Sequence, residues 1–348
     1  MKKLCLLGTI VAMVTFFTIT ATAADWNFYG SARLSTFVTD TDNKGVLVDT
    51  TNYAQSLHSN ARIGAKVTVS DTLTGRFEYG ASGGNANIRH LFGEWDFGSG
   101  KLLVGQTDTP VNMSLSNQVY GGDKLLDPYG HVDGQRHPMV RLSFGNFKIA
   151  AIQPETTTWV APGTTTEVKI PKIEASYHLE LDNAFLDFQG GYQTYEIKNT
   201  TTFVTHDVVS YVLAVGGQIK WGAAYIGADV WLGRNTGPYK LSCDVDDNPA
   251  VSGTALIDND SLGYAIAAGY KLNETISFEA GYGYTQGELK IGASGKDKLN
   301  AYYLQSTITL AQGVFFVPEI GVIDNKKDTL GNEEPRLRYA GIKWQINF

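Results

Sequence analysis

The feature that most constrains this chain is an alternation of apolar and polar residues with a period of two. In residues 61–69, for example, Ile63, Ala65 and Val67 alternate with Arg62 and Lys66. Period two is typical of β-strands whose two faces meet different surroundings. No helical period of comparable length competes with it. We therefore predict an all-β fold.

Sixteen such segments are predicted along the chain. They cover residues 28–35, 61–69, 73–79, 88–97, 101–107, 138–144, 147–153, 168–180, 185–195, 207–219, 223–233, 260–271, 275–285, 299–310, 314–323 and 336–348. Short turns alternate with long polar loops, which are predicted at 41–58, 82–87, 108–136, 154–166, 196–206, 234–259, 286–298 and 324–335. An antiparallel up-and-down sheet with turns at one rim and loops at the other has this pattern. No boundary divides residues 24–348, which we predict to be one domain.

The charged residues of these strands indicate which face meets which surroundings. A soluble ring of 16 strands could not fill its interior with side chains. In a membrane barrel the apolar face points to lipid, where one Arg or Lys near the midplane costs about 2–4 kcal/mol. Six strand bases all fall on the polar face: Arg33, Arg62, Lys66, Arg76, Arg141 and Lys148. The sequence therefore predicts a 16-stranded antiparallel transmembrane β-barrel.

The first 23 residues are typical of a secretory signal peptide. Lys2 and Lys3 precede an apolar stretch over residues 4–17, and Ala21 and Ala23 offer a cleavage site. After cleavage Cys243 would be the only cysteine, so we expect no internal disulfide. The formal charge of −7 argues against a nucleic-acid partner.

One loop differs from the others. The segment 108–136 is long, contains four aspartates and has no sustained period. An insertion of this length between hairpins is usually functional. We predict that it folds into the barrel lumen and narrows it.

Residues 88–107, IRHLFGEWDFGSGKLLVGQT, together with the strand order and the terminal Phe348, resemble the Gram-negative general diffusion porins. The resemblance implies a third loop that bends into the barrel, with loop acids facing wall bases, and a homotrimer in the outer membrane. Carried onto this chain, the loop acids would be Asp108, Asp123, Asp127 and Asp133, and the bases would come from Arg33, Arg62, Arg76 and Arg141. The chain departs from the family by reading GGDK at 121–124 in place of the loop's usual acidic-glycine motif.

The expected function is passive diffusion of small hydrophilic solutes and ions through a water-filled channel. Its wall would be lined by the bases Arg33, Arg62, Lys66, Arg76 and Arg141 and by the acids Glu78 and Glu94. Because the chain is acidic overall, we predict a weak cation preference. Outer-membrane lipids are the expected surroundings, and no cofactor, metal or enzymatic activity is expected.

Three alternatives stay open. A substrate-selective channel would need an aromatic track for sugars or an arginine ladder for phosphate, and neither is evident. An outer-membrane hydrolase would need a paired histidine, for which His178 and the His206-Asp207 step are the candidates. The acidic segments 40–43 and 244–248 could bind a divalent cation, although neither has the pattern of a calcium loop.

Overall fold

The computed structural model describes residues 24–45, 47–82, 85–156, 163–242, 245–252, 254–290 and 295–348. The predicted signal peptide and Cys243 lie outside these residues. The strands of the first half are β1 (Asp25–Asp42), β2 (Thr50–Leu57), β3 (Arg62–Ser70), β4 (Leu73–Ser82), β5 (Asn85–Asp96), β6 (Lys101–Asp108), β7 (Arg136–Phe144), β8 (Phe147–Ile152), β9 (Thr164–Glu167) and β10 (Lys172–Glu180). Those of the second half are β11 (Ala184–Asn199), β12 (Thr205–Trp221), β13 (Ala224–Arg234), β14 (Ala250–Ser252), β15 (Ala255–Ile257), β16 (Asn259–Lys271), β17 (Ile276–Leu289), β18 (Asp297–Ala311), β19 (Val314–Asn325) and β20 (Arg336–Asn347).

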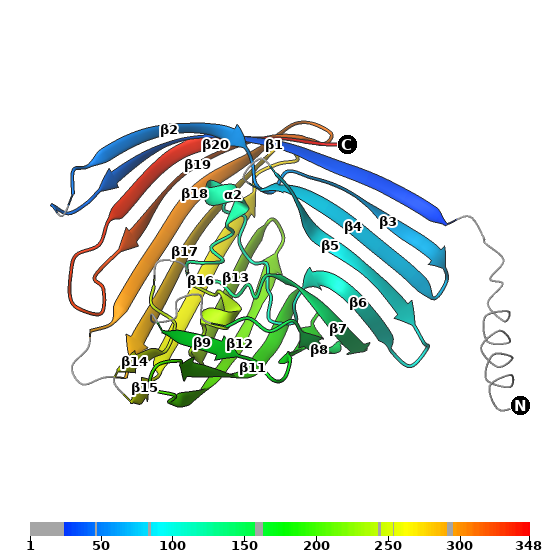
Figure 1. Ribbon diagram of the computed structural model, residues 1–348. Coiled ribbons are helices and arrows are strands. Elements are labelled where there is room, and N and C mark those ends of the chain that lie inside the picture. The colour runs from blue at the N-terminus through cyan, green and yellow to red at the C-terminus, as the bar shows by residue number, and fades with distance from the viewer. Residues whose placement is uncertain are drawn as a thin grey trace, which may run out of the picture.

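All of these strands except β14 and β15, which pair with each other, form a closed antiparallel barrel (Figure 1). Each strand of the barrel pairs with its neighbours in the chain, and β20 pairs with β1 to complete the ring. The described sheet has 18 strands, but β2 continues the position of β3 beside β1, and β9 continues that of β10 beside β11. The ring therefore has 16 positions, as the alternation predicted.

The two faces of the strands are inverted relative to a soluble protein. On β13, Val230 and Leu232 are 40% and 49% exposed. Asp229 and Trp231, which alternate with them, are 4% and 1% exposed. The same alternation of exposed apolar and buried polar residues recurs around the ring. An exposed apolar belt of this extent suits hydrocarbon rather than water.

The short turns lie where the sequence placed them, but the expected strict alternation of short turns and long loops is wrong in detail. Strands β4 and β5 are separated only by residues 83–84, and β11 and β12 only by residues 200–204, so no long loops occupy 82–87 and 196–206. Segment 41–58 contains all of β2. In all three places the strands pair beyond the segments predicted from the alternation, so hydrogen bonding continues where a loop was expected.

The two ends of the described barrel meet in one contact. The backbone of Gly30 in β1 exchanges two hydrogen bonds with Phe348, of 2.7 and 3.0 Å. A Cβ at Gly30 would lie 2.5 Å from the ring of Phe348, so glycine is required here for the ring to pack.

Helix is scarce in this fold. Among the described residues the helical elements are α2 (Tyr120–Asp123) and the 3₁₀ turn η1 (Gly237–Tyr239), and no described helix is long and apolar enough to span a membrane. Both short elements lie in insertions between strands, and both contribute to the site described below.

Candidate functional site

The insertion between β6 and β7, residues 109–135, is fastened to the barrel wall by buried carboxylates. Glu174 on β10 accepts a 3.0 Å hydrogen bond from the backbone N–H of Val111. Glu279 on β17 accepts two bonds of 2.6 Å from the backbone and side-chain nitrogens of Asn117. Hydrogen bonds to ionised groups are stronger than neutral ones, so each carboxylate is an effective anchor.

A third carboxylate continues the series. Glu319 on β19 accepts bonds of 2.6 and 3.0 Å from the backbone N–H groups of Val119 and Tyr120. Each of the three acids stands beside an exposed apolar residue of its strand (Ile173, Phe278 or Ile320). They therefore belong to the face opposite the apolar belt, and the insertion runs along that face across β10, β17 and β19.

The end of the insertion is held by a different pair. The ring of His131 hydrogen bonds through Nδ1 to Asp229 on β13, and both side chains are fully buried. Burial alone would lower the pKa of His131, but the charge and hydrogen bond of Asp229 outweigh it and raise this pKa above its usual value. A Cβ at the neighbouring Gly130 would lie 2.4 Å from the carbonyl oxygens of Tyr264 and Tyr284. The insertion thus lies directly against the backbone of the wall.

A second insertion, between β13 and β16, packs on the first. Tyr239 and Leu241 are fully buried and share an apolar cluster with Val111, Val132 and Trp231. Beneath it the buried Lys172 pairs with Glu174 at 3.1 Å and lies 4.7 Å from the ring centroid of Tyr239. Sequence reasoning missed this role, because the composition of residues 234–259 predicts only another long polar loop.

The loop acid Asp123, at the end of α2, lies between two strands. It pairs with Arg33 on β1 and, at 2.8 Å, with Lys343 on β20, and it accepts a 2.8 Å hydrogen bond from Asn60. Burial alone would raise the pKa of Asp123, but Lys343, His58 and Arg33 together hold it below its usual value. The structure thus brings together Asp123 and Arg33, one acid and one base singled out from the sequence.

Most of the other singled-out bases gather around a wall acid instead of the loop. Glu78 on β4 is fully buried and contacts Arg76 at 2.7 Å, Arg89 at 2.6 Å and Arg62 at 3.7 Å. It also accepts a 2.8 Å hydrogen bond from the hydroxyl of Tyr29. The pairing of β4 with β5 shifts between Glu78 and Tyr79 and leaves Arg89 as the extra residue of a bulge in β5. This bulge turns Arg89 toward Glu78, although its parity in the sequence is that of the apolar face.

The remaining predicted residues have local partners. Arg141 contacts Glu94 at 3.4 Å, and Asp108, the last residue of β6, pairs with Arg136 at 3.0 Å. Asp133 accepts hydrogen bonds from Asn112 and from the backbone of Gln135. Burial, together with the neighbouring Asp133, raises the pKa of Asp127 well above its usual range. Lys66 lies opposite Arg76 in the ladder of β3 and β4.

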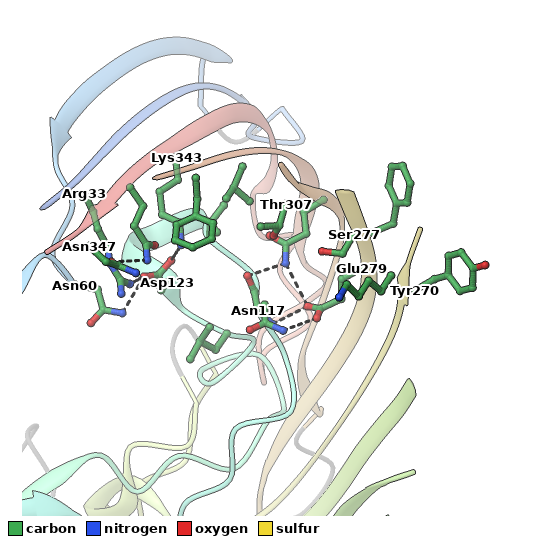
Figure 2. A pocket seen from close by; sticks show the side chains of 18 of the residues that line it. Arg33, Asn60, Asn117, Asp123, Tyr270, Ser277, Glu279, Thr307, Lys343 and Asn347 are labelled. Carbon is green, nitrogen blue, oxygen red and sulfur yellow. Dashed lines mark hydrogen bonds and ion pairs between the residues drawn. The ribbon is translucent and has the colours of Figure 1, made fainter. Parts of the chain in front are cut away.

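Several cavities lie along this inner face. One of about 570 Å³ lies between α2 and Glu279 (Figure 2). A second, of about 480 Å³, is lined by Arg33, Arg62, Lys66, Arg76 and a single acid, Glu78. Over the four cavities along this face, the described lining residues include twelve Lys or Arg and seven Asp or Glu. The lining is therefore basic although the chain as a whole is acidic.

Of the two candidate catalytic histidines, His178 is held by carboxylates. Both ring nitrogens of His178 face carboxylates, Asp187 and Glu180, at 2.8 Å each, so neither nitrogen faces a hydroxyl nucleophile. His206 is the second residue of β12 and therefore lies at the rim, beside the segment 200–204 that joins β11 to β12. In the described parts of the chain no three His, Cys, Asp or Glu side chains are placed to bind a metal ion.

Comparison with known proteins places the barrel among solved structures. No protein-family model and no curated protein sequence matches the chain. The outer-membrane channel DcaP of Acinetobacter baumannii superposes with a TM-score of 0.77 at 18% identity, covering 93% of this chain and 97% of DcaP. The fold is that of the outer-membrane porins.

Two further structures have the same porin fold. The trimer form of OmpT, an outer-membrane protein of Vibrio cholerae, gives a TM-score of 0.60 at 19% identity, covering 94% of this chain and all of OmpT. An anion-selective porin from Comamonas acidovorans gives 0.59 at 13% identity, covering 93% of this chain and all of that porin.

Proposed function

We propose that this protein is an outer-membrane channel through which small hydrophilic solutes and ions diffuse passively. The observation that supports this most is the inversion of the barrel: an apolar belt outside and a charged, hollowed face inside, on a porin fold. The insertion 109–135, anchored across that inner face, narrows the lumen. Apolar solutes are slowed because they cannot replace the water held between fixed charges.

The loop acids contribute to this constriction unequally. Asp123 sits between Arg33 and Lys343 and fixes α2 to the wall. Asp127 and Asp133 line the same cavity as Arg89 and Arg136, which makes them the acids that meet a passing solute. Asp108 contributes at the end of β6, where it lines a cavity with Arg141.

The charges of the lining favour anions. The weak cation preference expected from the sequence followed from the acidity of the whole chain, but most of that acidity lies away from the lining or is used to hold the insertion. Bases outnumber acids among the lining residues, and Arg62 and Arg76 keep about a quarter of their side-chain surface exposed. We therefore propose an anion preference, the property named for the Comamonas porin.

A homotrimer is the proposed assembly, supported by the trimer form of the Vibrio protein. The complete barrel, purified and reconstituted into a planar bilayer, tests channel and assembly together. Step-like conductance in groups of three, with a reversal potential in a salt gradient of the sign for anions, is the expected result. A bilayer that stays silent at micromolar protein would overturn the channel, and a cation-type reversal potential would overturn the selectivity.

A further inference from the structure

The cavity between α2 and Glu279 has two hydrogen-bond acceptors that no described residue satisfies. Gln305 on β18 is 4% exposed, and its Oε1 is buried without a partner, as is Oδ1 of Asn60. Both residues line the cavity. A buried acceptor without a donor is costly, so an occupant that donates hydrogen bonds to both of these acceptors would gain binding free energy.

The amide nitrogens of these residues are already committed. Nε2 of Gln305 donates to the backbone oxygen of Asn117 at 2.9 Å, and Nδ2 of Asn60 donates to Asp123 at 2.8 Å. These bonds fix which end of each amide faces inward. The free acceptors are therefore built into the anchoring of the insertion.

The acids of the cavity are also committed. Figure 2 shows Glu279 bound by Asn117, and Asp123 beside Arg33 and Lys343, with which it is paired. Glu279 also accepts hydrogen bonds from the hydroxyls of Tyr225 and Tyr303. At least one base of the cavity is less fully paired than these acids. Arg62 lines the cavity with 27% of its side chain exposed, and its contact with Glu78 is 3.7 Å.

We propose that this cavity is a binding site for a small polyhydroxylated carboxylate, such as a sugar acid. The hydroxyls donate to Gln305 Oε1 and Asn60 Oδ1, and the carboxylate faces Arg62. A cationic amine would satisfy the acceptors but meets four bases against two acids in the lining, and a carboxylate without hydroxyls leaves both acceptors unpaired. A volume of about 570 Å³ lies within the range of small-molecule sites and holds a hexose-sized solute with water.

This proposal rests on the proposed channel, because the cavity lies along its path, but binding is measurable without conduction. Titration calorimetry of the detergent-purified barrel uses three probes: glucuronate, glucose, which lacks the carboxylate, and cyclohexanecarboxylate, which lacks the hydroxyls. Glucuronate is expected to bind saturably, at least fivefold more tightly than either of the other two. Equal binding of all three probes, or no saturable binding of glucuronate, overturns the site.

The chain offers a matched pair of variants for the same titration. Gln305→Leu removes one free acceptor and one bond to the insertion. Gln189→Leu removes a comparable buried glutamine, whose Nε2 donates to the backbone oxygen of Asn112 at 2.7 Å and which lines a different cavity. We expect glucuronate to bind about fivefold more weakly to the Gln305 variant and within twofold of the native value to the Gln189 variant. An equal loss in both variants would assign the effect to the insertion and overturn the site.

Bilayer recordings of the same preparations separate the two proposals. Saturable glucuronate binding in a barrel that conducts no ions would contradict the proposed channel and support the proposed binding site. Ion conduction with no saturable glucuronate binding would do the reverse.

Discussion

Two parts of the barrel wall place charged residues on the inner face in different surroundings. On β10, β13, β17 and β19 the inward acids are buried under the insertion and hydrogen bond to it, as Glu279 and Glu319 do. On β3 and β4 the inward bases cluster around one acid, Glu78, and keep part of their surface exposed. A charge on the inner face is thus buried and bonded to the insertion where the insertion covers it, and partly exposed where it does not.

The largest loss of stability is expected from removing the acids that anchor the insertion. Glu279→Leu combined with Glu319→Leu strands the N–H groups of Asn117, Val119 and Tyr120, each worth about 1–3 kcal/mol when left unpaired. We expect the free energy of unfolding to fall by on the order of 5 kcal/mol, and the open-channel current to become noisy as the insertion loosens. Denaturant unfolding in micelles and single-channel recording measure the two effects.

The matched control for that change is Glu94→Leu. Glu94 is an acid facing the same interior, but it is partly exposed and its contacts to Arg141 and Lys101 are 3.4 and 3.8 Å. We expect the Glu94→Leu variant to have a free energy of unfolding within about 1 kcal/mol of the native value. A loss as large as in the double variant would mean that covering by the insertion does not distinguish the walls.

A second, smaller effect is expected from neutralising the open wall. Arg62→Gln, Lys66→Gln and Arg76→Gln together remove three exposed positive charges, while Arg89 and Tyr29 still hold Glu78. One charge at 4 Å in water is worth about 1 kcal/mol, so we expect the anion-to-cation permeability ratio to fall roughly tenfold. Reversal potentials in a salt gradient give this ratio.

The control for this triple variant neutralises three bases at the outer rim of the barrel. Lys296, Lys326 and Lys327 are exposed bases of the loops between β17 and β18 and between β19 and β20. Neutralising these three is expected to leave the permeability ratio nearly unchanged, because exposed charges beyond a Debye length are screened. An equal shift in both variants would show that net charge, and not the open wall, sets selectivity.

The smallest effect concerns pH. The folded pKa of His131 is raised, so its pairing with Asp229 stabilises the fold fully below the unfolded value near 6.5, and this contribution is lost as pH rises through the folded value. The unfolding midpoint should therefore decline as the pH rises above about 6.5. His131→Gln should flatten this decline, and an unchanged slope in that variant would remove His131 from the account.

The sequence predicted the barrel better than it predicted the site, for a physical reason. Alternation records which residues face lipid, because a misplaced base there is expensive, and so Arg62, Arg76 and Arg141 could be assigned to the inner face. It does not record what covers that face. The anchoring acids and the burial of Tyr239 depend on contacts between distant segments, and Arg89 reached the inner face only through a bulge.

Joining Gly30 to Phe348 has a consequence for how this molecule is made. The first strand cannot find its second neighbour until β20 has been made, so every intermediate without β20 carries two open sheet edges. Closure is also a contact of nearly the greatest possible sequence separation, the kind that forms slowly. The two edges of the unfinished sheet therefore stay unpaired until β20 reaches β1.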